Sequence, residues 1–284
     1  MLLPLWTACD KDIHENESHG LAVGMEWLEG IEPTDITSPV NLWIYDAEGH
    51  EVEAHEFSSP QELASGLFSL PEGDYTLVGV CGLTEPFRYD YENGTRTADM
   101  LRVSLADPSA SPAHAVGGVA GASVTDTRIN LRSVIRVAPL LAELTVRING
   151  VPEGASLAVT VRNAATCLYP ARQGDDNSYI VPSAEKSEAH LPQAVADGGT
   201  LSAGARLMPT AQGETCTLLY LVMTFADGSR HEYTAEAPLM LAGKRYELAL
   251  EYDRMQPYMY ITATDINPWG EGWITSDDIF NPGI

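Results

Sequence analysis

The chain contains 284 residues, with 16 Lys and Arg against 40 Asp and Glu, so its formal net charge is −24. A field of this sign repels phosphate backbones and anionic head groups, so we expect no nucleic-acid partner. We interpret the acidity mainly as a solubility feature, with binding of cations or basic partners as the alternative. The length is sufficient for two domains, each with its own hydrophobic core.

Four widely spaced cysteines form no Cys-x-x-Cys pair, so we expect neither a zinc cluster nor a redox motif. If the first is set aside, at most one disulfide can form among the other three, and one thiol stays free. The alternative, which we favour, is that these three are small buried hydrophobic residues within strands. No cofactor or metal is expected. The four are Cys9, Cys81, Cys167 and Cys216.

The amino terminus changes abruptly from apolar to acidic. Residues 1–8 carry no charge, and a polar stretch runs from Cys9 to His19. Small Thr7 and Ala8 before Cys9 resemble a lipobox, in which the thiol is acylated and the preceding segment is removed. We therefore expect Cys9 to be the lipid attachment site and the first mature residue. Trp6 replaces the usual Leu, and the positively charged start of a signal peptide is missing, so an ordinary apolar terminus with a chance cysteine is the alternative.

From Gly20 onward, short runs of Val, Leu, Tyr and Thr alternate with Gly, Pro, Asn and Asp, which favours an all-β sandwich fold. Ser59 and Pro60 predict the start of a single helical turn, as N-cap and first helical residue. The first strands are expected at Leu21–Trp27, Val40–Tyr45 and Val52–Phe57. No later run of eighteen apolar residues predicts a membrane span.

The segment Leu70–Val80 predicts a Pro-Glu-Gly turn that leads into a strand, with Tyr75, Leu77 and either Val78 or Gly79 in a close-packed interior. Hairpins of this kind are common in transthyretin-like sandwiches. Asp107–Asp126 is poor in large apolar side chains and is expected to be a long loop. Within it, Gly117–Gly121 lacks the context of a phosphate-binding loop.

Thr127–Val137 predicts a closing strand with three arginines facing outward: Arg128, Arg132 and Arg136. Pro139 interrupts this run, and alternation resumes from Leu144 to Ile148, which places a domain boundary at about residue 138. The expected organisation is an amino-terminal remnant and linker (1–19), a first sandwich (20–138) and a second (139–284). Strands of the second are expected at Leu157–Val161, Thr217–Phe225, His231–Ala235, Glu247–Tyr252 and Tyr258–Thr264.

Three features in order resemble one family: Cys9 with the acidic residues after it, the Leu70–Tyr75 hairpin, and the closing segment from Ala242–Tyr246 through Ile266–Trp273. They are similar to the fimbrillin-like and minor-fimbria anchor lipoproteins of Bacteroidales, which are subunits of type V pili. The resemblance implies two tandem transthyretin-like, Greek-key β-sandwich domains and assembly by strand exchange. It implies no catalytic residue.

The expected function is that of a non-catalytic cell-surface lipoprotein acting as an anchor, accessory or tip subunit in cell adhesion and fimbria assembly. Its expected partners are other fimbrial subunits, with the outer membrane reached through the lipid. Enzyme motifs such as G-x-S-x-G, the P-loop and H-E-x-x-H are missing from the sequence. Acidic pairs drawn from Asp74, Asp175 and Asp176 are expected by chance in so acidic a chain. We expect all seven histidines to be solvated.

The main alternative is a carbohydrate- or protein-binding surface lipoprotein with an exposed aromatic row. Six aromatic residues are candidates: Trp43, Tyr45, Tyr89, Tyr91, Trp269 and Trp273. Packing within or across strands is the more common role of such residues, and only an exposed row of three or more favours a sugar site.

The segment after Tyr252 is a candidate for a donated strand. Pro257 limits pairing at the start of Tyr258–Thr264, and Ile279–Pro282 forms a short apolar stretch beyond Trp273 that no obvious turn folds back. The alternative is that this stretch covers the protein's own core.

Overall fold

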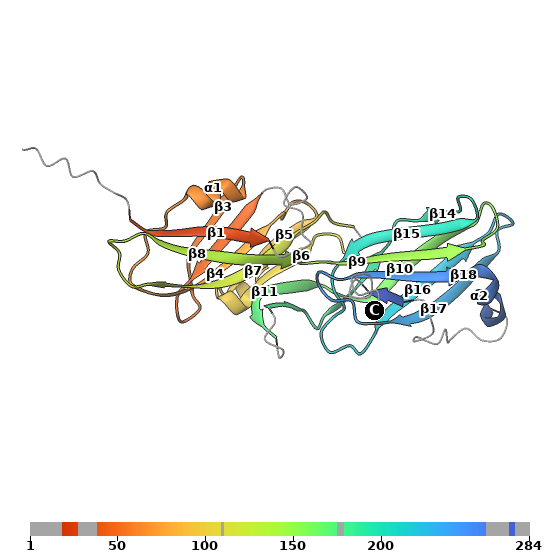
Figure 1. The fold of residues 1–284 in the computed structure, drawn as a ribbon. Helices are drawn as coiled ribbons and strands as arrows, with labels where there is room; N and C mark the ends of the chain where they lie inside the picture. Colours follow the sequence, from red (N-terminus) through yellow and green to blue (C-terminus); the bar gives the residue numbers. More distant parts are fainter. Residues whose placement is uncertain (1–18, 28–38, 109–110, 175–178, 260–272, 276–284) are drawn as a thin grey trace, which may run out of the picture.

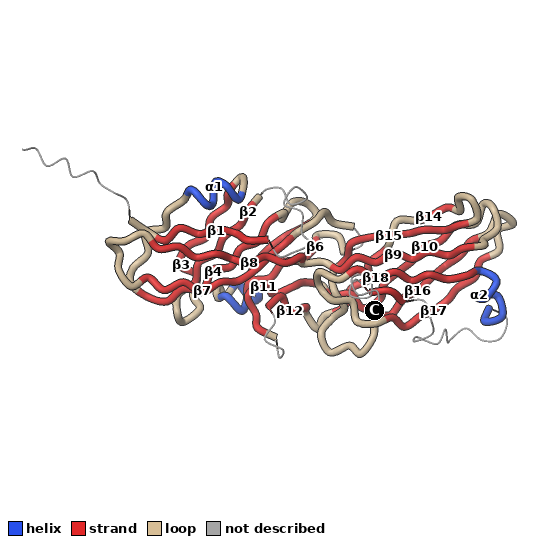
Figure 2. The backbone as a smooth tube through the Cα atoms, in the orientation of Figure 1, coloured by secondary structure: helices blue, strands red, loops and turns tan. Residues whose placement is uncertain are grey.

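A computed structural model of the chain describes residues 19–27, 39–108, 111–174, 179–259 and 273–275. Strands dominate it, and the two α-helices are short: α1 (Pro60–Ser65) and α2 (Tyr252–Met259). The strands form several sheets in two parts that lie end to end (Figures 1 and 2). The predicted all-β class is confirmed, whereas the division into two transthyretin-like sandwiches stays a prediction.

The first part contains a six-stranded sheet with one unusual edge. The edge strand β1 pairs in parallel with β8, whereas β2, β3, β4 and β7 are joined by antiparallel ladders. The strand β8 pairs with β7 only at Val116↔Pro139 and Gly117↔Ala138. The strand order is β1 (Leu21–Trp27), β8 (Leu131–Pro139), β7 (Val116–Val124), β4 (Gly73–Cys81), β2 (Val40–Tyr45) and β3 (Glu51–Phe57).

A second sheet combines strands from distant stretches of the chain. The strand order is β12 (Tyr179–Pro182), β11 (Cys167–Gln173), β6 (Leu101–Leu105) and β5 (Phe87–Tyr91). The first two form a hairpin that follows residue 166, and the last two belong to the first part of the chain. Short 3-10 turns, η2 (Glu92–Gly94) and η3 (Ala98–Met100), connect β5 to β6. The hairpin β11–β12 follows residue 138 in the sequence, yet β11 pairs with β6 of the first part. The domain boundary predicted at about residue 138 stays a prediction, and this hairpin would cross it.

The second part has two sheets. One contains β13 (Lys186–His190), β10 (Ser156–Ala165), β16 (Thr217–Thr224) and β17 (Arg230–Ala237), with β14 (Ala194–Val195) also pairing with β10. The other has the order β15 (Thr200–Leu207), β9 (Ala142–Asn149), β18 (Arg245–Glu251) and β19 (Trp273–Thr275). The strand β8 leads directly into β9 where the two parts meet (Figure 1).

Buried apolar side chains form two clusters. The larger one runs from Trp43 and Tyr45 in the first part, through Leu140 and Leu141, to Tyr246 in the second. The smaller one joins β1, β8 and α1 to one face of β2 and β4. A core that continues through the junction indicates that the two parts are packed against each other and not merely tethered.

Local sequence signals placed α1 and β4 correctly. The Ser59 side chain accepts a hydrogen bond from the Glu62 backbone N–H at 3.1 Å and thereby caps α1, whose first residue is Pro60. In β4, Tyr75 and Leu77 are buried, as their alternation predicted.

The expectation of a loop over Asp107–Asp126 is wrong for its second half. Residues 116–124 form β7, which lies between β8 and β4. Close packing requires a glycine at 118, because a Cβ there would lie 2.0 Å from the carbonyl oxygen of Arg136. Gly118 therefore marks a close backbone approach.

Two further expectations are corrected at strand ends. The outward arginines Arg128, Arg132 and Arg136 are exposed as predicted, but β8 begins at Leu131 and not at 127. A last strand from Tyr258 is wrong for its first two residues, because Tyr258 and Met259 close helix α2. The remainder of that segment lies outside the described residues.

Candidate functional site: an open strand edge and the joint behind it

The strand β1 occupies the edge of the six-stranded sheet. It pairs in parallel with β8 from Leu21↔Leu131 to Trp27↔Val137, about 110 residues away along the chain. Edge strands expose backbone donors and acceptors on one side, and these can pair with another chain.

The backbone of β1 has one side turned to β8 and the other turned away from it. The N–H and C=O of Leu21 both bond to Phe68, each at 2.9 Å, whereas the preceding Gly20 accepts from Leu131 of β8. Since successive strand residues alternate, the backbone groups of Val23, Met25 and Trp27 point away from β8 as those of Leu21 do. Beyond the bridge to Phe68, no strand of the described part pairs with β1 on this side.

The side chains of β1 are held firmly although its backbone edge is open. Leu21 and Val23 are 2% and 1% exposed. Met25 lies over Gly79 of β4, where a Cβ would come within 2.6 Å of the Met25 Cε. The Cys81 thiol donates to the Met25 sulfur at 3.2 Å. The buried side chains therefore fix the position of β1, and with it the positions of the backbone groups along its outer edge.

The exposed side chains of β1 add little to the stability of its pairing with β8. Glu26 and Arg136 form an ion pair at 3.2 Å, but their side chains are 57% and 74% exposed. Exposed pairs of this kind typically contribute at most about 1 kcal/mol.

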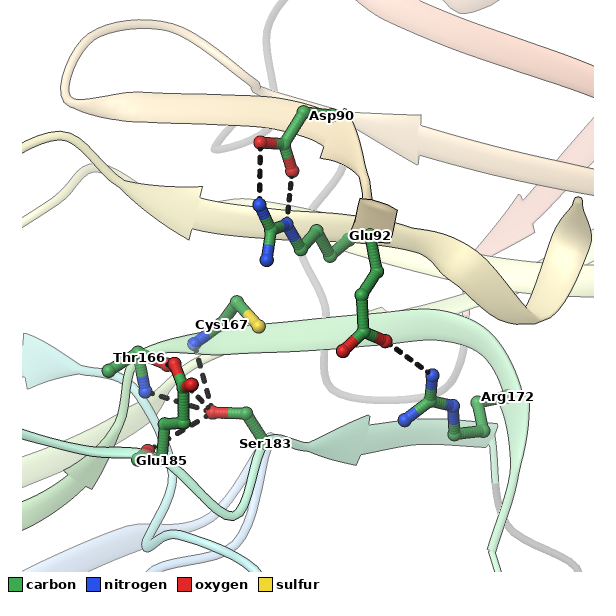
Figure 3. Close-up of polar contacts among 8 residues, drawn as sticks. Asp90, Glu92, Thr166, Cys167, Arg172, Ser183 and Glu185 are labelled. Carbon is green, nitrogen blue, oxygen red and sulfur yellow. Dashed lines mark hydrogen bonds and ion pairs between the residues drawn. The ribbon is translucent and has the colours of Figure 1, made fainter. Parts of the chain in front are cut away.

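Behind the edge, a polar joint fixes the point where the chain passes from β10 into β11. The buried Ser183 hydroxyl accepts from the backbone N–H groups of Thr166 and Cys167, at 3.1 and 3.3 Å, and donates to the Glu185 carbonyl at 3.1 Å (Figure 3). The Thr166 N–H also donates to the Glu185 carbonyl at 3.1 Å, so Ser183 and Glu185 together satisfy the backbone where β10 of one sheet becomes β11 of another.

Arg172 attaches the far end of β11 to the β5–β6 connection. Its guanidinium donates to Glu92 at 3.3 Å (Figure 3). It also donates to the Asp99 carbonyl at 2.8 Å and stacks on the Tyr169 ring at 3.5 Å. Burial, with nearby groups including Cys167 and Glu92, raises the pKa of Tyr169 to about 12. Planar stacking combined with forked donation is specific to arginine.

A second polar contact links the segment before β7 to the second part. Glu143 on β9 pairs with Arg206 at 3.2 Å and Arg245 at 2.8 Å, and His114 lies 3.8 Å away. The Arg206 backbone N–H also donates to the Ser111 hydroxyl at 3.2 Å. The junction is therefore held on two sides.

Four of the six predicted aromatic residues come together, but not as an exposed row. Trp43 and Tyr45 are buried, and Trp43 packs edge-on against Tyr89 with centroids 5.1 Å apart. The Tyr45 and Tyr91 hydroxyls are 3.0 Å apart, and Tyr91 donates to Glu51. Burial raises the pKa of both tyrosines above the ordinary value. Of these four, only Tyr89 is exposed, at 46%. The indole positions of Trp269 and Trp273 lie outside the described side chains.

The predicted lipid attachment site, Cys9, lies outside the described residues, as do Asp175 and Asp176. The three other cysteines are free, with Cys81 and Cys167 buried and Cys216 half-buried. The six described histidines are exposed or half-buried.

No group of three or more His, Cys, Asp or Glu side chains within the described ranges is arranged to hold a metal ion. The helices of the described part include none with the length and apolar character needed to cross a bilayer.

Sequence reasoning missed Ser183 and Arg172. Each acts through a contact with a distant part of the chain, such as Arg172 with Glu92, so local periodicity carries no signal for it. Gly79 was expected in the close-packed interior, since an isolated Gly inside a strand pattern indicates a close approach of another group.

These features define an all-β protein in which, among the described residues, the edge strand β1 has no partner strand on the side away from β8. The model of the fimbrillin-A associated anchor proteins Mfa1 and Mfa2 matches residues 18–275. The chain belongs to this family. A search of curated proteins finds no match to it.

Solved structures share the fold at low sequence identity. The fimbrial anchor protein Mfa2 from Porphyromonas gingivalis is 13% identical with a TM-score of 0.54, covering 81% of this chain and 90% of that one. A candidate adhesin from Bacteroides ovatus is 13% identical with a TM-score of 0.57, covering 82% and 88%. A protein from Bacteroides thetaiotaomicron described as polysaccharide-binding is 12% identical with a TM-score of 0.56, covering 82% and 92%.

Proposed function

We propose that the chain is a non-catalytic fimbrial subunit that acts at the cell surface as an anchor or accessory subunit in adhesion. In this proposal the acylated Cys9 holds it in the outer membrane, and other fimbrial subunits are its partners. Membership of the anchor-protein family supports the fimbrial role. The abrupt apolar-to-acidic change at Cys9 supports the lipid attachment.

The observation that carries the proposal is the open edge of β1. Val23, Met25 and Trp27 turn their backbone groups away from β8, while the inward side chains fix the strand. A strand from a partner gains backbone hydrogen bonds there, each with a net contribution of about 0.5–1.5 kcal/mol, and burial of alternate side chains adds to this.

The joint holds the two parts of the chain against each other. Ser183 and Arg172 attach the β11–β12 hairpin to strands formed by the first part. The continuous core through Leu140 and Leu141 adds apolar packing at the same junction.

Trp27 allows the edge to be tested with a matched control. Trp27→Pro removes a backbone N–H on the open side without removing one that faces β8, whereas Trp27→Ala removes the same indole but retains the N–H. We expect fimbrial subunits to co-purify with the wild type and Trp27→Ala from outer membranes, and to be lost with Trp27→Pro at the melting temperature of Trp27→Ala, which lacks the same packing of the indole against the smaller cluster. Equal recovery with both variants would reject β1 as the binding edge.

The carbohydrate-binding alternative has less support. Trp43 and Tyr45 are buried in the core, so they are not available to stack on a sugar ring. Tyr89 alone among the described candidates offers an exposed ring face. Binding to a glycan array that is lost in Tyr89→Ala would favour this alternative.

A further inference from the structure

Two exposed leucines lie on the loop between β17 and β18. Leu239 is 37% exposed and Leu241 is 53% exposed, whereas Met240 between them is fully buried. Exposed large apolar side chains that lie close together mark a surface that another segment covers.

The loop holds these leucines outward in one fixed conformation. The Tyr246 hydroxyl donates to the Leu239 carbonyl at 2.8 Å and accepts from the Leu241 N–H at 3.0 Å. The Met240 N–H donates to the Thr210 hydroxyl at 2.9 Å, and its carbonyl accepts from the Thr210 N–H, also at 2.9 Å. Because Met240 fills the core position, neither leucine can turn inward without breaking these bonds.

The strand β19 directs the chain toward this loop. It runs antiparallel to β18, from Trp273↔Leu248 to Thr275↔Tyr246, so it ends beside the residue whose hydroxyl holds the loop. The distance from Thr275 to the Leu241 backbone is therefore one strand spacing of roughly 5 Å plus the length of one tyrosine side chain and a hydrogen bond. Four or five extended residues span roughly 13–17 Å.

The sequence after Thr275 has the matching chemistry. Ile279 and Phe280 follow at the required distance, and they are the first large apolar residues after β19. Asp277 and Asp278 precede them in the sequence, and the cations Lys244 and Arg245 lie next to Tyr246, the partner of Thr275. Negative charge and apolar side chains thus occur in the same order along the segment and along the surface.

We propose that residues 276–284 dock on the β17–β18 loop of their own chain, with Ile279 and Phe280 covering Leu239 and Leu241. This segment then serves as an internal cover and not as a strand donated to a neighbouring subunit. The docking extends the return of the chain along β18, contrary to the expectation that no turn folds it back after Trp273. The inference does not depend on the proposed function.

Hydrogen exchange of the peptide that covers residues 276–284, in the full chain, tests the docking. We expect exchange about tenfold faster in the double variant Leu239→Ser, Leu241→Ser, and equally in Phe280→Ser. Leu67→Ser is the matched control, because Leu67 is 43% exposed and lies next to α1 in the first part. It should leave the exchange of this peptide unchanged.

Equal exchange in the wild type and in the leucine double variant would overturn the proposal. Protection that rises with protein concentration would also overturn it, because it would show docking between copies. Deletion of Asp277–Ile284 is the second test. It should increase binding of an apolar dye, and that increase should be abolished when Leu239→Ser and Leu241→Ser are added.

Discussion

Met25 on β1 fits against Gly79 on β4 so closely that a Cβ on the glycine would lie 2.6 Å from the Met25 Cε. The same Cβ would lie 2.9 Å from the Ile135 Cδ1 of β8. Gly79 therefore provides the space in which the edge strand and its neighbour meet the rest of the sheet.

Gly79→Ala should destabilise the protein by about 1–3 kcal/mol, because Met25 and Ile135 must both move to admit the methyl group. Urea unfolding measures the change. Gly121→Ala in β7 is the control, since nothing lies within 4 Å of a Cβ built there. Similar losses in both variants would show that strand flexibility and not packing explains the glycine.

Ser183→Ala should destabilise the joint by about 1–3 kcal/mol, because the backbone N–H groups of Thr166 and Cys167 lose a buried acceptor. Amide exchange at Cys167 should become faster. Ser229→Ala, in the exposed turn between β16 and β17, should change the stability little. Unchanged exchange at Cys167 would contradict the role assigned to Ser183, whereas the Thr166 N–H keeps the Glu185 carbonyl as an acceptor.

Burial raises the pKa of the Cys81 thiol to about 12. The unfolded thiol loses its proton at lower pH than the native one, so this residue contributes stability below its unfolded pKa of about 8.5 and loses that contribution as the pH rises toward 12. Cys81→Ala should therefore flatten the alkaline fall in unfolding free energy between about pH 9 and 11. An identical pH profile in the variant would contradict this assignment.

The lipid proposal is tested by metabolic labelling with a fatty acid. Label should follow the wild-type protein and be lost in Cys9→Ala, because an acylated thiol requires that cysteine. Cys216→Ala controls for labelling at a half-buried thiol and should retain the label. Label that persists in Cys9→Ala, or none in the wild type, would exclude this attachment site.

Alternating and capped segments were predictable from the sequence, whereas distant pairings were not. Ser59 with Pro60 and the turn before Tyr75 are local signals, and the structure follows them. The strand β7 was missed because its glycines and alanines have the composition of a loop, although a Cβ on Gly118 would lie 2.0 Å from the Arg136 carbonyl oxygen. Small residues mean flexibility in solvent but close packing in a sheet, and composition alone does not distinguish the two.

The candidate site depends on pairings that the sequence does not encode locally. Leu21 and Leu131 become partners across most of the first part, and Cys167 pairs with Ser104. An alternating pattern predicts that β1 is a strand, but which side of it lacks a partner strand follows only from its pairing with β8. The edge could therefore be suspected from the sequence but not located.

Residue-resolved amide exchange along β1, measured on the isolated protein and on protein assembled with fimbrial subunits, tests the central claim most directly. The account predicts that the amides of Val23, Met25 and Trp27 exchange rapidly in the isolated protein and become protected on assembly. The amides of Gly24 and Glu26, which face β8, should be slow in both states. Protection of Val23, Met25 and Trp27 that does not change on assembly would contradict pairing at this edge.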